Sequence, residues 1–182
     1  MSDYRSNLTL NQVAAQLKEA ETFLLTTHAK PDGDAIGSMV ALSEALEAMG
    51  KKVQRWVMPP LPKPLKVLTE GLKLHYYADA TNPPPEGEPQ RIVVLDTGSW
   101  AQLKPLQPWL KTRNERITVI DHHLHGNDVG RSIYTDPTSA ATAQIIHRLI
   151  GLLGAQPSLR ALEAMYVGVA SDTGWFRFSN TT

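Results

Sequence analysis

The chain of 182 residues contains no cysteine. Disulfide frameworks and thiolate metal sites are therefore excluded, and any metal ion would be held by His, Asp or Glu side chains. Charge of one sign is not in excess either, because Lys and Arg together number 18 and Asp and Glu together number 18. A balanced chain offers no global positive field to a long nucleic acid, so we expect any anionic substrate to be small.

Long apolar runs are also lacking. No run is long and apolar enough to span a bilayer, and no stretch of signal-peptide type follows residues 1–5. We therefore expect no membrane contact and a cytoplasmic location. A hydrophobic content of 42% over this length fits one globular domain, and the oligomeric state is left open, a homodimer included.

Strand-like and helix-like patterns alternate along the chain. The predicted strands cover residues 22–27, 53–57, 91–96 and 116–121, and the last two runs both end in Asp. The predicted helices cover residues 10–20, 35–49, 139–150 and 159–170. The third helix is expected to be capped by Thr138 or Ser139 and ended by Gly151. The alternation predicts an α/β fold with a doubly wound, mainly parallel sheet and helices on both faces.

Carboxylate and imidazole side chains recur where apolar segments give way to polar or glycine-containing sequence. The most informative segment is Asp121-His122-His123, which follows an apolar run. The others are His28-Ala29-Lys30-Pro31-Asp32-Gly33-Asp34, Asp96-Thr97-Gly98 and Asp172-Thr173-Gly174. Ligands of doubly wound sheets bind outside the carboxyl ends of the strands, so one pocket is expected to gather these groups. They suit two hard divalent ions, and histidine adds affinity for manganese-like ions over magnesium.

Each segment has a simpler interpretation by itself. Pro31-Asp32-Gly33 is typical of a turn, and Asp34 of a helix N-cap. Four compatible groups at predicted strand or helix ends favour the metal site over these separate roles. The histidines outside the four segments, His75, His125 and His147, are interpreted as surface or packing residues.

The segment Trp175-Phe176-Arg177-Phe178 has two interpretations. Its aromatic content predicts a strand with one buried face. The alternative is a platform on which a nucleobase stacks, with Arg177 contacting a phosphate of the substrate.

The four segments, in this order, resemble the DHH phosphoesterase superfamily over about residues 24–182. Residues 28–38 and 171–181 are most similar to its bacterial nano-RNase branch, which degrades very short RNA oligonucleotides and removes the 3′-phosphate from 3′-phosphoadenosine 5′-phosphate. The resemblance implies a manganese-dependent hydrolase of exoribonuclease and nucleotide-phosphatase type. Two ions would activate a water for in-line attack on phosphorus, with magnesium as a substitute.

The resemblance also implies a role for each motif residue. It makes His28, Asp32 and Asp96 ligands of one manganese ion. It makes Asp34, Asp96, His122 and Asp172 ligands of the other, with Asp96 as the bridge. The catalytic residues would be Asp121, which orients an imidazole, and His123, which contacts the scissile phosphate.

Members of this branch continue into a smaller DHH-associated domain that grips the substrate. We expect residues 1–182 to be the DHH catalytic domain alone, with that second domain absent from the chain. The alternatives are a pyrophosphatase or cyclic-dinucleotide phosphodiesterase of the same superfamily, a metal- or nucleotide-binding module with little activity, and a structural α/β protein.

Overall fold

Six parallel strands form one sheet in the computed structural model, which describes residues 4–77 and 87–181. They are β1 (Thr22–Thr27), β2 (Lys52–Val57), β3 (Leu74–Tyr76), β4 (Arg91–Leu95), β5 (Ile117–Asp121) and β6 (Ser132–Thr135). Their order in the sheet is β3-β2-β1-β4-β5-β6. The direction of winding reverses between β1 and β4, which is where ligands bind in such sheets. The predicted α/β class and parallel sheet are confirmed.

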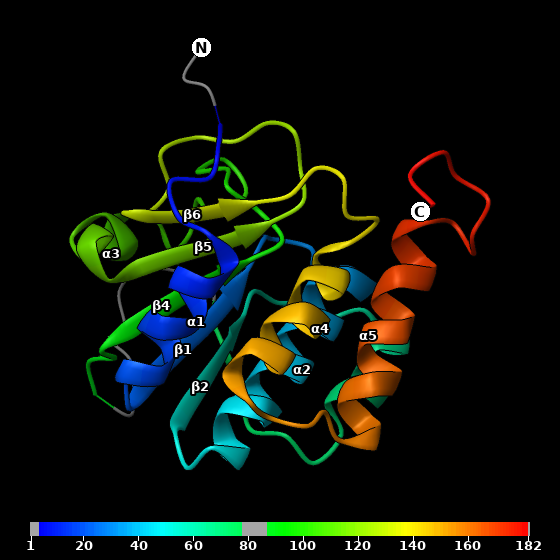
Figure 1. The fold of residues 1–182 in the computed structure, drawn as a ribbon, viewed down its shortest axis with the longest axis horizontal. Coiled ribbons are helices and arrows are strands. Elements are labelled where there is room, and N and C mark those ends of the chain that lie inside the picture. Colours follow the sequence, from blue (N-terminus) through cyan, green and yellow to red (C-terminus); the bar gives the residue numbers. More distant parts are fainter. Residues whose placement is uncertain (1–3, 78–86, 182) are drawn as a thin grey trace.

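Helices cover both faces of the sheet, but unequally (Figure 1). The helices are α1 (Leu10–Glu19), α2 (Gly33–Ala48), α3 (Gln107–Lys111), α4 (Thr142–Leu153) and α5 (Leu159–Asp172), with 3-10 turns η1 (Lys63–Thr69) and η2 (Asn114–Arg116). One face carries α1, α2 and α4, and α5 packs outside them against α2 and α4. The other face carries α3 and the loop before it. Within the described residues, none of these helices has the length and hydropathy to cross a bilayer.

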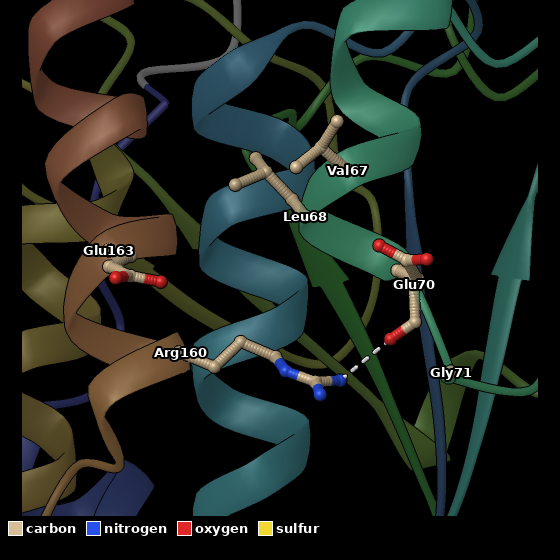
Figure 2. Close-up of a pocket in the computed structure, with 6 residues that line it drawn as sticks. All are labelled: Val67, Leu68, Glu70, Gly71, Arg160 and Glu163. Carbon is tan, nitrogen blue, oxygen red and sulfur yellow. Dashed lines mark hydrogen bonds between the residues drawn. The ribbon is translucent and has the colours of Figure 1, made fainter.

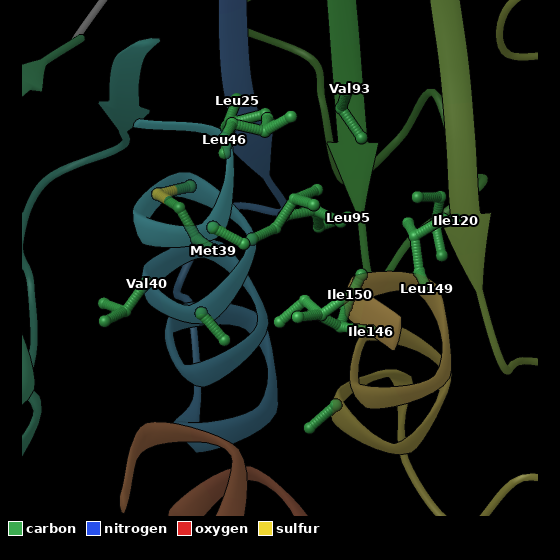
Figure 3. Packing of buried hydrophobic residues seen from close by; sticks show 14 of the residues in the cluster. Leu25, Met39, Val40, Leu46, Val93, Leu95, Ile120, Ile146, Leu149 and Ile150 are labelled. Atoms are coloured by element: carbon green, nitrogen blue, oxygen red, sulfur yellow. The ribbon is translucent and has the colours of Figure 1, made fainter. Parts of the chain in front are cut away.

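Side chains of each strand alternate between two hydrophobic cores. Leu25 and Val93 lie on the face covered by α2 and α4, in one hydrophobic cluster with Met39 and Ile146 (Figure 3). Leu24, the neighbour of Leu25 in β1, belongs to the core on the opposite face, with Trp56 and Trp109. Successive strand residues face opposite sides, so strands buried on both sides read as continuous apolar runs. Burying one such side chain contributes about 1.5–3 kcal/mol.

Helices α2 and α5 approach each other closely. A Cβ atom on Gly37 would clash with the carbonyl oxygen of Ala164 in α5. A Cβ atom on Gly168 would lie 2.9 Å from the Cβ of Ala143 in α4. Glycine at these positions therefore allows the backbones to meet, and the contact brings the end of α5 beside the start of α2.

The predicted boundaries of the third long helix were wrong at both ends. Helix α4 begins at Thr142 after Ala141, whose side chain makes no capping hydrogen bond. The helix runs past Gly151 to Gly154, which adopts the left-handed conformation at φ 80°. Thr138 and Ser139 instead lie in a turn closed by hydrogen bonds to Asp136. The free N–H groups of Thr142 and Ala143 at the start of α4 donate instead to the carboxylate of Asp34, which is distant in sequence.

The strand predicted at residues 175–178 was also wrong. These residues form turns, and Gly174, Trp175 and Phe176 have φ values of 56°, 57° and 62°. Trp175, Phe176 and Phe178 are 67%, 49% and 59% exposed. The segment follows α5, which packs mainly on other helices, and among the described residues it pairs with no strand of the sheet.

Candidate metal centre

The adjacent ends of β1 and β4 bring the first group of candidate ligands together. His28 directly follows β1 and Asp96 directly follows β4, and His28 Nε2 lies 3.5 Å from Asp96 Oδ2. Asp32 caps α2, where its Oδ1 accepts hydrogen bonds from the N–H groups of Asp34 and Ala35 at 3.0 Å. The other oxygen of Asp32 lies 3.9 Å from His28 Nε2. One ligand atom each of His28, Asp32 and Asp96 lies within 4.8 Å of the others.

A second group of candidate ligands lies beside the first. It consists of Asp34 in the first turn of α2, His122 after β5, and Asp172 at the end of α5. His122 Nε2 lies 4.0 Å from Asp34 Oδ2 and 3.4 Å from Asp172 Oδ2. It also lies 3.7 Å from Asp96 Oδ1. The two oxygens of Asp96 therefore face the two groups.

Asp34 is fully buried and is held by the start of α4. Its Oδ2 accepts a hydrogen bond from the Thr142 N–H at 2.6 Å, and its Oδ1 accepts one from the Ala143 N–H at 2.8 Å. A carboxylate at a helix N-terminus satisfies unpaired donors and meets the positive end of the helix dipole. Burial and the nearby charge of Asp96 nevertheless raise the pKa of Asp34 well above its usual range. A bound cation would offset that repulsion.

Thr142 was not among the predicted site residues. Its hydroxyl donates to Asp96 Oδ1 at 2.9 Å, so one residue orients a carboxylate of each group. Its position at the start of a predicted helix carried no signal, because Asp96 lies 46 residues away along the chain.

The backbone of Asp96 is in an unusual conformation. Its φ of 60° is in the left-handed region, which residues other than glycine seldom adopt. The Asp96 N–H donates to the carbonyl oxygen of Ile120 at 3.0 Å, and the residue is buried. Strain of this kind persists where the surrounding structure enforces it, and it is frequent at functional sites.

The donor set fits divalent metal ions. His122 Nδ1 donates to the carbonyl oxygen of Ser139 at 3.3 Å, which leaves the Nε2 lone pair directed at the carboxylates. This Nε2 is buried and has no hydrogen-bond partner in the described part of the chain. Buried polar atoms are rarely left unpaired. Together the two groups offer four carboxylates and two imidazoles, which suit ions of manganese or magnesium type.

Asp121 and His123 form a pair beside these groups. Asp121 Oδ1 accepts a hydrogen bond from His123 Nδ1 at 2.7 Å. Burial alone would raise the pKa of Asp121, but hydrogen bonds from His123 and Tyr4 lower it below its usual value. The bond to Asp121 raises the pKa of His123 to about 9. His123 is half exposed, and its Nδ1 lies 3.9 Å from Asp96 Oδ1.

The remaining predicted residues lie farther out. Arg177 is exposed in the turn after α5, and its side chain makes no hydrogen bond or ion pair with the ligand groups among the described residues. Asn180, from the same segment, donates to Asp172 Oδ2 at 3.4 Å and to the Ala140 carbonyl oxygen at 3.1 Å. His125 and His147 are exposed and belong to no ligand group within the described residues.

A cavity away from the candidate ligands lies at the other end of α5. Its volume is ≈ 420 Å³. It lies between η1 and the start of α5, where Arg160 donates to the Glu70 carbonyl oxygen at 2.9 Å (Figure 2). Arg160 and Asp172 are at opposite ends of α5, about 18 Å apart at the rise of an α-helix. The candidate ligands therefore lie away from this cavity.

Fold and ligand geometry together define an α/β protein with a candidate divalent-metal centre at the carboxyl edge of its sheet. The family model described as the N-terminal domain of the DHH family matches residues 22–169. The chain belongs to the DHH family. Membership indicates a hydrolase of phosphoesterase type, as the resemblance in the sequence had implied.

Two relatives have been assigned activities. The bifunctional oligoribonuclease and PAP phosphatase NrnA of Thermus thermophilus is 36% identical over 173 residues, which are 93% of this chain and 49% of the relative. The protein of the same name from Bacillus subtilis is 29% identical over 168 residues, 89% of this chain and 49% of the relative. The chain thus spans about half the length of the curated relatives it matches.

Solved structures share the fold. An exopolyphosphatase-related protein from Bacteroides fragilis superposes with a TM-score of 0.84 at 26% identity, covering 95% of this chain and 52% of that one. RecJ from Thermus thermophilus, solved in complex with Mn²⁺, gives a TM-score of 0.58 at 20% identity, covering 92% and 25%. The second likeness concerns the fold alone.

Proposed function

We propose that the chain is a manganese-dependent phosphoesterase that hydrolyses short oligoribonucleotides, 3′-phosphoadenosine 5′-phosphate, or both. The observation that carries the proposal is the buried Nε2 of His122, which faces Asp34, Asp96 and Asp172 with no hydrogen-bond partner among the described residues. The names of the NrnA relatives support the substrate class.

In this proposal two ions share the site. One would be held by His28, Asp32 and Asp96. The other would be held by Asp34, Asp96, His122 and Asp172. When bound, such ions lower the pKa of a water molecule and neutralise charge on the phosphate, and magnesium would be a substitute for manganese. Asp96 suits the bridge because each of its oxygens faces one group.

His123 is proposed to contact the scissile phosphate. Its Nδ1 is bonded to Asp121, which leaves Nε2 for a phosphoryl oxygen. The hydrogen bond to Asp121 raises the pKa of His123, which favours the protonated imidazole, and this form donates a charged hydrogen bond. Asp121 fixes the ring in that orientation, so the donor is already in place when negative charge develops.

Arg177 is proposed to contact a second part of the substrate. It lies among exposed aromatic side chains in the segment that Asn180 links to Asp172. Aromatic faces stack on nucleobases and arginine pairs with phosphate, so this segment suits a nucleotide better than pyrophosphate.

Residues 1–182 would act as the catalytic domain. A second domain, or the other copy in a homodimer, would hold the rest of the substrate, so its absence would weaken binding more than bond cleavage. Short RNA fragments and nucleotides are formed and consumed inside cells, and a cytoplasmic location is part of the proposal.

The test is phosphate release by the purified chain with manganese. Phosphate should be released from 3′-phosphoadenosine 5′-phosphate and from an activated phosphoester, and dinucleotides to pentanucleotides should be cleaved with weak binding and little length preference. Faster hydrolysis of pyrophosphate would favour the second candidate, a pyrophosphatase. The Bacteroides fragilis protein is named exopolyphosphatase-related, and polyphosphate shares its phosphoanhydride bond with pyrophosphate. Manganese binding by calorimetry without turnover would leave a binding module.

A further inference from the structure

Tyr4 lies against the Asp121-His122-His123 segment. Its hydroxyl donates to Asp121 Oδ2 at 2.7 Å. The other oxygen, Oδ1, accepts hydrogen bonds from His123 Nδ1 at 2.7 Å and from the N–H groups of His122 at 2.9 Å and His123 at 3.3 Å. The carboxylate of Asp121 is therefore shared between the phenol of Tyr4 and the imidazole of His123.

The ring of Tyr4 fills the space between two loops of the site. A Cβ atom on Gly98 or on Gly126 would clash with this ring. Gly98 belongs to the loop that carries Asp96, and its carbonyl oxygen accepts a hydrogen bond from the Asn127 N–H at 2.7 Å. The two glycines thus leave room for an aromatic side chain from the start of the chain.

The segment around Tyr4 is fixed to the edge strand β6. The Asn7 N–H donates to the Ile133 carbonyl oxygen at 2.9 Å, and the Ile133 N–H donates to Asn7 Oδ1 at 2.8 Å. Ser6 Oγ makes a similar pair of 2.8 Å bonds with the backbone of Thr135. These bonds satisfy strand-edge groups and hold Tyr4 in place.

We propose that Tyr4 is a positioning residue that acts through Asp121 on His123. The proposal rests on the proposed function for the role of His123 at the phosphate. A donor on Oδ2 fixes the plane of the carboxylate, so Oδ1 remains aimed at His123 Nδ1 and the ring keeps its orientation. Burial and the charge of Asp121 raise the pKa of Tyr4 above its usual value, so its hydroxyl stays a donor.

Replacing the hydroxyl tests this role. Tyr4→Phe keeps the ring between the glycines and should lower kcat about tenfold, with KM and manganese affinity changed less than about twofold. Tyr76→Phe is the matched control, because Tyr76 is exposed on β3 at the opposite edge of the sheet. In the His123→Ala background, Tyr4→Phe should cost less than about twofold more, since both changes break one chain of contacts. Independent, multiplying losses would overturn the proposal.

A spectroscopic measurement separates this inference from the proposed function. In protein with nitrogen-15-labelled histidine, the His123 ring signals are assigned by their loss in His123→Ala. Tyr4→Phe should shift these signals and Tyr76→Phe should not. Signals that stay unmoved in Tyr4→Phe would overturn the role of Tyr4. A wild-type chain without manganese-dependent phosphate release would defeat the proposed function, while the ring signals would still decide whether Tyr4 acts through Asp121.

Discussion

The carboxyl edge of the sheet, which carries the candidate ligands, and the C-terminal segment, residues 174–181, differ in how they hold their side chains. At the carboxyl edge, Asp34 and Asp96 are buried and accept hydrogen bonds from residues of α4. In the C-terminal segment, Trp175 and Phe178 are 67% and 59% exposed. The edge is arranged before any ligand arrives, whereas ordering the exposed side chains would cost conformational entropy on binding.

This difference suggests a division of labour. Rigid carboxylates and imidazoles suit metal ions and the reacting phosphate, which need fixed geometry. Exposed aromatic side chains suit substrates of varied sequence, because every base has a face on which to stack. Changes at the edge should therefore affect metal binding and kcat, and changes in the C-terminal segment should affect KM.

Substituting the shared carboxylate should have the largest effect. Asp96→Asn removes a charge that faces both ligand groups, so manganese should bind weakly at both sites and activity should fall by about 1,000-fold, or about 4 kcal/mol. His28→Ala should weaken one site, because His28 contacts only the first group. Calorimetric titration with manganese checks both variants. An equal loss of a single site in both would contradict the bridge.

The second largest effect is expected for His123→Ala. Loss of a charged donor to the phosphate should lower kcat about 100-fold while the metal stoichiometry stays at the wild-type value. His125→Ala, two residues along and exposed, is the control with expected wild-type activity. Loss of a metal ion from His123→Ala would mean that His123, which lies near Asp96 and His122, is itself a ligand.

Arg177→Ala should have a smaller effect and a different kind of effect. Loss of a phosphate contact outside the edge should raise KM for 3′-phosphoadenosine 5′-phosphate about tenfold and change kcat little. Arg131→Ala removes an exposed arginine near β6 and serves as the control. If steady-state kinetics show a fall in kcat at constant KM, the proposed division between edge and C-terminal segment fails.

The smallest effect is expected on stability, in the turn that supports His122. Burial by itself would raise the pKa of Asp136 in this turn. Hydrogen bonds from Thr138, Arg148 and Ser139 outweigh burial and lower that pKa below its usual value. The stabilisation is therefore present above the unfolded pKa of about 3.9 and is lost as the pH falls. Asp136→Asn should cost about 1 kcal/mol at pH 7 and less at pH 3.

Urea unfolding at the two pH values measures this difference, with exposed Asp128→Asn as the control. A cost for Asp136→Asn that is equal at both pH values would show that the charge of Asp136 does not stabilise the turn.

Four of the six strands, the parallel sheet and the six candidate ligands were predictable from local sequence patterns. Buried parallel strands need apolar residues on both faces, so residues 91–95 and 117–120 are recognisable one segment at a time. The carboxyl ends of parallel strands lie at one edge, and this rule alone predicted that His28, Asp96 and His122 would meet.

The groups that support those ligands became apparent only from the packing of the folded chain. Asp34 accepts hydrogen bonds from N–H groups of α4 that are 108 and 109 residues away along the chain. The hydroxyl of Tyr4 donates to Asp121, which is 117 residues away. Local patterns of polarity carry no information about such pairs. The aromatic residues 175–178 have strand propensity, yet they form turns because α5 leaves them beyond the sheet. Propensity acts within a segment, whereas a partner strand or a distant donor is supplied only by the packing of the whole chain.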